Sequence, residues 1–232
     1  MPLLTVDVDR EVRALRPDFA ALALRVSGVR NGPGTADSER CLDQAEALAR
    51  GTTEPHPHVL AWREAFRAFG AKPQRTASSV DALWQRAAKG QLPRLNWLVD
   101  LYNAVSVLHA LPVGGEDAAQ FEGTLRLIRA SGTEPFDTVK AGVPAVESPD
   151  PGEVVWADTR GVTCRRWNWR QGTRTRLTDA STDVLFILER LEPFPLDQLH
   201  AAGDALLAAI QARCPDIRIH RQLLGRGEEE TP

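Results

Sequence analysis

The chain has 232 residues, of which 43% are hydrophobic and 25% are charged, and its formal net charge is −3. This length supports one sizeable core, and the acidic balance excludes a generally basic nucleic-acid-binding protein, so contact with nucleic acid needs a local patch. The three cysteines, Cys41, Cys164 and Cys214, are widely spaced, which favours a reducing compartment over a disulfide framework.

Acidic residues occur too early in the first segment for a signal peptide, and no apolar run reaches the ~20 residues that a membrane helix needs. We therefore expect a cytoplasmic protein that does not contact a membrane. The sequence contains no glycine-rich phosphate-binding loop, no nucleophile elbow and no metal-ligand spacing. Cofactors and metal ions are accordingly not expected.

The first half of the chain is predicted to be mainly helical. Its expected elements are a strand near 3–8, a brief helix, a strand at 19–29, and helices at 37–49, 57–70, 78–90 and 99–111. The last of these helices stops at Leu111-Pro112, because proline cannot continue a helix. A turn through Val113-Gly114-Gly115 is expected next, since glycine permits turn conformations.

The second half of the chain changes to strand-like patterns. Strands are expected at 124–130, 153–158, 162–169, 173–178 and 184–189, a proline-rich loop at 142–152, and a final helix from Pro195 to about Arg213. Helices first and strands later predict an α+β domain. We expect a single domain over residues 1–224 and a disordered tail at 225–232.

The helix before the expected turn carries polar residues beside an apolar stripe. Asp100 and Asn103 are three residues apart and so share one face, and Glu116 and Asp117 follow just past the turn. A polar amide and an acidic turn held on a packed helix are suited to binding a small polar ligand. The alternatives are a surface amide at Asn103, and a solvated turn or helix N-cap at Glu116 and Asp117.

Six arginines without an intervening acid form what we call the arginine strip: Arg160, Arg165, Arg166, Arg170, Arg174 and Arg176. Trp167 and Trp169 lie within the strip and flank Asn168. Arginines neutralise phosphates and tryptophans offer stacking planes, so the segment is suited to a single-stranded RNA end or a nucleotide. Equally, the arginines could coat the solvent side of two strands while the tryptophans fill the core.

Three ordered segments resemble a known family. They are LPRLNWLVDLYNAVSVLHALPVGGED at 92–117, TEPFD at 133–137 and EVVWADTRGVTCRRWNWRQGTRTRLTDASTDVLFILE at 153–189. Together they resemble the editing module of the phenylalanyl-tRNA synthetase beta subunit (domains B-three and B-four), especially its free-standing form, over about residues 60–192. The resemblance implies the layered β/β/α fold of that module, with helices mainly in the first half and a mixed sheet in the second.

The resemblance further implies an RNA-binding protein that hydrolyses misacylated aminoacyl-tRNA in trans, an aminoacyl-tRNA deacylase of translation quality control. Asn103 falls on an asparagine of the family's helix motif, and Asp117 matches an acid of its pattern. Glu189 lies near the glutamate that reads a tyrosine hydroxyl in the family. The family's histidine after the proline turn is missing here, and Trp167-Asn168-Trp169 stands where small pocket residues are expected, which leaves the substrate amino acid open.

We assign the candidate residues to three roles. The catalytic set, which would position water and stabilise a developing oxyanion, is Asn103, Gly114, Gly115 and Glu116. The substrate-binding set is Asp117, Trp167, Asn168, Trp169 and Glu189, and the arginine strip is assigned to RNA. The geometric prediction is that Asn103, Gly114, Asn168 and Glu189 line one cavity.

Two other hypotheses compete with a deacylase. A non-catalytic binding module would use the reshaped pocket for tRNA, an amino acid, a nucleotide or another small metabolite, and the missing histidine and the inserted tryptophans favour it. A tRNA-contacting accessory protein without a pocket function would need an exposed arginine strip, and the acidic overall balance weakens this third hypothesis.

Overall fold

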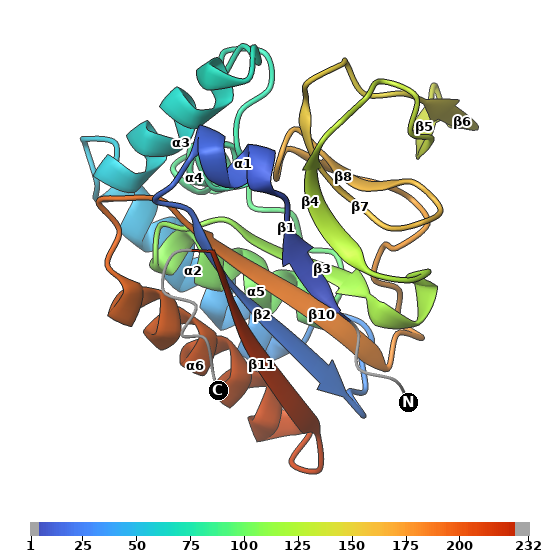
Figure 1. Ribbon diagram of the computed structural model, residues 1–232. Helices are drawn as coiled ribbons and strands as arrows, with labels where there is room; N and C mark the ends of the chain where they lie inside the picture. The colour runs from blue at the N-terminus through green and yellow to red at the C-terminus, as the bar shows by residue number, and fades with distance from the viewer. Residues whose placement is uncertain (1–4, 226–232) are drawn as a thin grey trace, which may run out of the picture.

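Two β-sheets and six α-helices make up the computed structural model, which describes residues 5–225 (Figure 1). The helices are α1 (Arg10–Leu15), α2 (Ala36–Arg50), α3 (Pro57–Ala68), α4 (Ser79–Ala87), α5 (Trp97–Leu108) and α6 (Leu196–Arg213), with a short 3-10 helix η1 (Ala118–Gln120). Side chains cap several of them. Ser78 accepts a hydrogen bond from a backbone N–H at the start of α4, and Asn96 does so at the start of α5.

The first sheet is antiparallel and has four strands in the order β11-β2-β10-β3. Its strands are β2 (Ala20–Ser27), β3 (Val113–Asp117), β10 (Asp183–Arg190) and β11 (Arg218–Gly225). The β3 strand is an edge strand, so one side of its backbone is free to bond outside the sheet.

The second sheet has seven strands, in the order β1-β4-β7-β8-β5-β6, and β9 pairs with β8 beside this path. Its strands are β1 (Val6–Val8), β4 (Leu125–Arg129), β5 (Phe136–Lys140), β6 (Val143–Glu147), β7 (Val154–Ala157), β8 (Val162–Arg165) and β9 (Arg170–Gln171). The pairing is mixed, because β1 with β4 and β5 with β8 are parallel while the other pairs are antiparallel.

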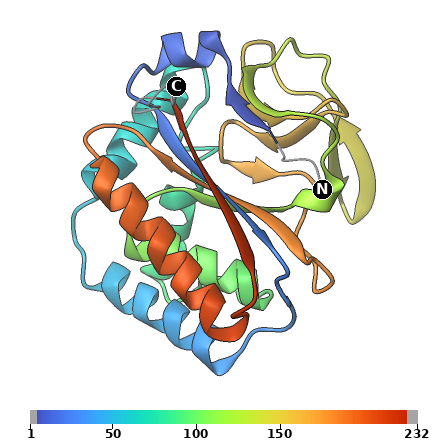
Figure 2. The same cartoon turned by 60° about the horizontal axis from the view of Figure 1, so that its bottom comes forward.

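The strand β10 is the centre of the layered arrangement, and all eight of its residues are buried. Alternation along the strand sends Phe186 and Leu188 into a core with α5 and α6, and Leu185 and Ile187 into a second core with α3 and the seven-stranded sheet. Figure 2 shows α6 lying along one face of the four-stranded sheet, with the second sheet beyond the other face. The result is the β/β/α layering and the α+β class expected from the sequence.

The structure confirms most of the expected elements and corrects others. The expected helices, the first two strands, and the strands near 125–129, 154–157 and 183–190 are present. The turn predicted at 113–115 is instead the start of β3, because pairing with β10 overrides the local glycine signal. The strand predicted at 162–169 ends at Arg165, and the segment 173–178 has only one bridge, between Arg176 and Glu116.

Four strands besides β3 were not expected, and one of them is the short β9. The predicted loop at 142–152 contains β6, whose Pro144 is tolerated because β6 is an edge strand. Its partner β5 and the strand β11 were also missed, and β11 ends at Gly225, which the sequence assigned to the tail. The rest of that tail and the first residues of the expected strand at 3–8 lie outside the described residues.

Within 5–225, no helix combines the length and apolar character needed to cross a bilayer.

Candidate functional site

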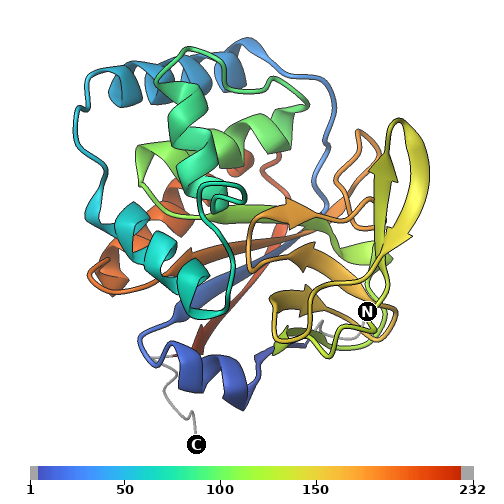
Figure 3. The same cartoon turned by 90° about the horizontal axis from the view of Figure 1, so that it is seen from above.

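A cavity of about 260 Å³ lies where the two sheets meet α4 and α5. Its lining comes from α4, α5, β3, β7, β8, β10 and the turn between β8 and β9. In Figure 3 the green helices α4 and α5 lie to one side of this region and the yellow and orange strands of the second sheet to the other. Asn103, Gly114, Asn168 and Glu189 all line this one cavity, which is the convergence predicted from the sequence.

The strand conformation of 113–117 separates the two adjacent acids. Gly114 pairs with Ile187 and Glu116 with Leu185, so both point toward the cavity side of β10. Asp117 points to the opposite face, where its carboxylate accepts hydrogen bonds from Ala119 N (3.0 Å) and Ser181 Oγ (2.6 Å). Asp117 therefore lies outside the cavity lining, and its expected role in substrate binding is corrected to a structural one.

The two glycines of β3 also differ from each other. A Cβ atom on Gly115 would lie 2.8 Å from Tyr102 Cε1, so the close packing of α5 requires glycine there, whereas a Cβ on Gly114 would meet no atom within 4 Å. Hydrogen bonds alternate along antiparallel strands, and Glu189 N donates to Pro112 O at 3.0 Å. The N–H of Gly114 therefore bonds to β10, and only the N–H of Gly115 faces the free edge. The sequence assigned both Gly114 and Gly115 to the stabilisation of an oxyanion. Only the backbone N–H of Gly115 remains available for this role.

Glu189 is a buried carboxylate at the end of β10. Its Oε1 accepts a hydrogen bond from Trp156 Nε1 (3.0 Å) and its Oε2 accepts one from Asn168 Nδ2 (2.7 Å). Burial raises the pKa of Glu189 to about 8, although these two hydrogen bonds favour the charged form. An acid at a strand end can also be solvated, but Glu189 is only 2% exposed.

Glu116 is the second buried carboxylate of the cavity. Its Oε1 accepts a hydrogen bond from Thr163 Oγ1 at 3.2 Å, and its Oε2 accepts one from Thr175 Oγ1. Burial raises the pKa of Glu116 to about 7, against the opposing effect of the two hydroxyl groups. The charge of Glu116 adds a smaller effect that also raises the pKa of Glu189. Groups with a pKa near neutrality in a cavity are candidates for proton transfer.

Two of the amides in the polar lining lie beside these carboxylates or on α5. Asn103, on α5, is 7% exposed, and its side chain makes no hydrogen bond within residues 5–225, so its amide is available to a ligand. Asn168 instead bridges two elements, because its Oδ1 accepts a hydrogen bond from Ser79 N at the start of α4 (3.2 Å) while its Nδ2 donates to Glu189. Asn168 thereby fixes the orientation of the Glu189 carboxylate.

The turn between β8 and β9 is held in an unfavourable conformation. Arg166 and Trp167 have φ angles of 46° and 65°, a left-handed region that bulky residues rarely adopt. The Trp167 ring is fully buried and packs edge-on against Phe19 and Trp62 at centroid distances of 5.2 and 5.4 Å. This turn places Trp167, Asn168 and Trp169 in the cavity wall, as expected for the tryptophan-flanked segment.

The arginine strip does not form one exposed surface. Arg165 is 6% exposed and makes two hydrogen bonds to Glu153, at 3.0 and 2.7 Å, and an ion pair with Glu147 at 3.1 Å. Arg166 lies beside it and contacts Glu153 through its backbone N–H and its guanidinium. The assignment of Arg165 to RNA is therefore corrected, because its charge is neutralised inside the protein.

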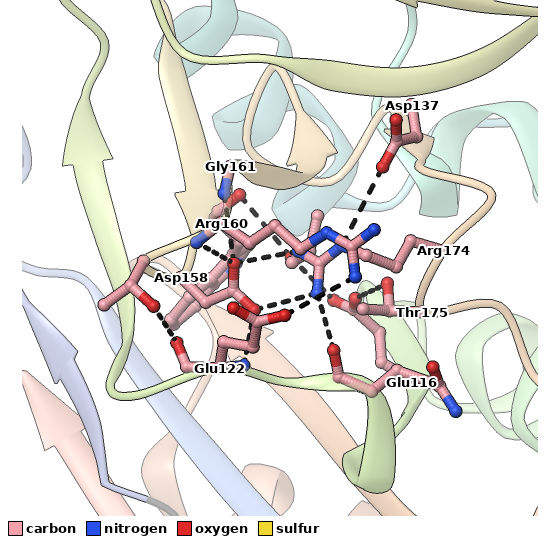
Figure 4. Close-up of polar contacts among 12 residues, drawn as sticks. Glu116, Glu122, Asp137, Asp158, Arg160, Gly161, Arg174 and Thr175 are labelled. Carbon is pink, nitrogen blue, oxygen red and sulfur yellow. Dashed lines mark hydrogen bonds and ion pairs between the residues drawn. The ribbon is translucent and has the colours of Figure 1, made fainter.

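A second structural cluster surrounds the buried carboxylate of Asp158 (Figure 4). Arg174 forms a two-pronged ion pair with Asp158, with distances of 2.9 and 2.8 Å, and the backbone N–H groups of Arg160 and Gly161 bond to the same carboxylate. The Arg160 guanidinium lies on the surface, 3.5 Å from Glu122. Arg174 therefore holds the loops together and is also removed from the expected RNA-binding set.

The remaining strip residues also lie away from the cavity. Arg170 donates to Thr138 Oγ1 at 2.7 Å, Arg176 is exposed, and none of the six arginines lines the cavity. Its lining arginine is Arg86, an exposed residue of α4 without an acidic partner among the described residues. Sequence reasoning missed Arg86. Its spacing of seven residues from Ser79 places both on one helix face, but the sequence does not indicate that this face borders a cavity.

The lining includes a thiol, Cys164, on β8. Burial raises the pKa of this thiol well above its usual value, and the nearby charges of Glu116 and Glu189 raise it further. Since the thiolate is the nucleophilic form, Cys164 is not an activated nucleophile at neutral pH. Cys164 is therefore not a candidate for a covalent intermediate at this site.

Comparison with known proteins gives two positive findings. The family model of the B3/4 domain matches residues 61–198. A solved N-terminal fragment of the phenylalanyl-tRNA synthetase beta-subunit from Pyrococcus horikoshii is similar at 13% sequence identity, with a TM-score of 0.46. That alignment covers 96% of this chain and 51% of the solved one, so this chain spans about half the length of that fragment. Among curated proteins, none matches the chain significantly.

Proposed function

Because the chain belongs to the B3/4 domain family, we propose that its cavity receives the aminoacyl group of an aminoacyl-tRNA and that the ester bond is hydrolysed there. The observation that carries this proposal is the meeting of two buried carboxylates and one uncommitted amide in a single cavity. At about 260 Å³, the cavity is just below the ~300 Å³ that begins the usual range for small-molecule sites. It therefore suits one aminoacyl group and not the nucleotides that follow it.

The chemistry requires a water, a proton acceptor and donors for the oxyanion. The water oxygen attacks the ester carbonyl, the bond from the carbonyl carbon to the ribose oxygen breaks, and this leaving oxygen takes the proton that the water releases and becomes a hydroxyl. Glu116 is suited to carry that proton, since its pKa of about 7 lies near the working pH. The side-chain amide of Asn103 and the backbone N–H of Gly115 are the candidate donors to the developing oxyanion.

The RNA is proposed to approach the mouth of the cavity. Among the lining residues, Arg86 and Gly114 are the exposed ones, so the cavity opens beside them. The unpaired guanidinium of Arg86 is suited to a phosphate near the acceptor end of the RNA. Arg160 and Arg176, which remain exposed, extend the proposed contact surface beyond the mouth.

A second candidate function is the binding of a free amino-acid-like molecule without hydrolysis. The observation that favours it is the internal pairing of Arg165 and Arg174, which leaves fewer free cations for RNA than the sequence indicates. A module of this kind would use the same cavity but would not need a path for a polynucleotide.

Deacylation assays with a panel of misacylated tRNAs separate these functions. We expect turnover with at least one of them, and we expect Asn103→Ala to lower that turnover by at least tenfold, because it removes a donor to the oxyanion. Leu108→Ala, at the exposed end of the same helix, is the matched control and should keep the wild-type rate. An absence of turnover across the panel, or full activity of Asn103→Ala, contradicts the proposal.

A further inference from the structure

We propose that the cavity selects an aminoacyl group whose side chain ends in a cation, and that Glu189 binds this cation between indole rings. The proposal rests on the proposed use of the cavity for an aminoacyl group, and it adds the chemical class of that group. Three features of the cavity support the proposal: the charged groups in its lining, the aromatic rings in its walls, and the hydrogen-bonding positions that the protein leaves open.

The lining contains two buried acidic residues and no buried cation among its described residues. Two carboxylates, Glu116 and Glu189, lie in the wall with 6% and 2% exposure. The single arginine or lysine among the described lining residues is Arg86, which is exposed at the mouth. Thr163, Thr175, Trp156 and Asn168 supply neutral hydrogen bonds to these carboxylates but no positive charge. Buried carboxyl groups that lack a cation hold protons instead, and a cation on the ligand would take the place of these protons and pair with the ionised carboxylates.

The walls of the cavity are aromatic. Trp156, Trp167 and Trp169 line it from the side of the second sheet, and Tyr102 lines it from α5. Aromatic faces attract ammonium groups, and tryptophan does so most strongly. Trp169 already stacks with two cations outside the cavity, since the guanidinium carbons of Arg166 and Arg170 lie 4.7 and 5.9 Å from its ring centroid. Rings alone would accept a neutral side chain, but rings combined with carboxylates favour a charged one.

Free hydrogen-bonding positions complete the match. The carboxylate of Glu189 accepts hydrogen bonds from Trp156 and Asn168, and the Trp167 indole also favours its charged form. A carboxylate has about four acceptor positions, so one position stays open to a donor of an ammonium group. The uncommitted amide of Asn103, which is nine-tenths buried, remains for the α-amino or carbonyl group of the same ligand. The volume accommodates about nine water-sized groups, comparable to the non-hydrogen atoms of a lysyl group.

Calorimetric titration with amino-acid amides tests the proposal without RNA or ester chemistry. Lysinamide and norleucinamide share the α-amino group and an unbranched side chain, but only lysinamide carries the terminal ammonium. We expect lysinamide to bind the wild-type protein at least tenfold more tightly than norleucinamide or tyrosinamide. In Glu189→Gln, the preference for lysinamide over norleucinamide should fall to less than threefold, whereas Glu54→Gln, a change at an exposed carboxylate, should keep it.

The possible outcomes are distinct. Equal or tighter binding of norleucinamide or tyrosinamide overturns the proposal, as does a failure of all three amides to bind the wild-type protein. Circular dichroism establishes that Glu189→Gln is folded. Should it not fold, Glu116→Gln replaces it, and a preference for lysinamide that this variant leaves unchanged also overturns the proposal. Turnover of misacylated tRNA without a lysinamide preference contradicts only this inference, and a lysinamide preference without turnover contradicts only the proposed hydrolysis.

Discussion

Replacing Arg165 with methionine is expected to lower the free energy of unfolding by about 3–5 kcal/mol, the usual effect of removing one partner of a buried ion pair. The guanidinium of Arg165 is the main charge partner of Glu153, which is 3% exposed, and it also pairs with Glu147. Methionine keeps an unbranched aliphatic stem but leaves Glu153 with the contacts of Arg166 and of the Asp150 backbone N–H. Urea unfolding followed by circular dichroism measures the loss as a lower midpoint at an unchanged slope.

Arg160→Met is the matched control for this experiment. Arg160 is exposed and lies 3.5 Å from Glu122, which is also exposed, so its loss should cost less than about 1 kcal/mol. If both variants lost the same small amount of stability, Arg165 would not be the buried structural charge that the geometry indicates. Its assignment to a free RNA-binding surface would then be restored.

The second large expected effect is a decrease in the stability of the folded protein as the pH rises. The folded protein holds protons on Glu116 and Glu189 up to about pH 7 and 8, whereas the unfolded chain releases them near pH 4.5. The native state therefore binds more protons in this window, and its stability falls as pH rises toward 8. Between pH 6.5 and 8 the expected loss is of the order of 1–2 kcal/mol per pH unit. Below pH 6.5 the buried His58, whose pKa burial lowers to about 4, acts in the opposite direction.

Glu116→Gln tests this pH dependence most cleanly. The hydroxyl groups of Thr163 and Thr175 can rotate to donate or accept, so they can satisfy an amide in place of the carboxylate. The variant also loses the repulsion that raises the pKa of Glu189, and the slope of stability against pH should fall to half or less. Glu54→Gln, at an exposed site, should keep the wild-type slope. If the slope of stability against pH were unchanged in Glu116→Gln, the pH dependence would not arise from Glu116 and Glu189.

The sequence predicted the helices well because their signals are local. Pro57 opens α3 and Ser78 caps α4, as their positions before apolar stripes indicate. The family resemblance was carried by residues within the matched range 61–198 and is confirmed. The convergence of Asn103 and Glu189 on one cavity followed from that resemblance, and local pattern alone would not have placed the two residues together.

The sequence predictions were wrong where the structure of a segment depends on residues far away in the sequence. The segment at Gly114 and Gly115 has the composition of a turn, but β10 supplies a strand partner that is far along the chain. The arginine strip contains no acid, yet Glu147, Glu153 and Asp158 reach it from earlier segments. These pairings depend on the tertiary fold, so the sequence of the strip could not reveal them.

The use of this cavity for an aminoacyl group is tested most directly with a non-hydrolysable aminoacyl-adenosine, in which an amide replaces the ester. Its binding is measured for the wild-type protein and for Gly114→Val. The cavity is exposed at Gly114 and offers open space to a Cβ there, so valine should enter the cavity without disturbing the protein around it. The wild-type protein is expected to bind the analogue, and Gly114→Val is expected to bind it at least tenfold more weakly while its unfolding midpoint stays the same. Wild-type affinity in Gly114→Val would show that the aminoacyl group binds elsewhere.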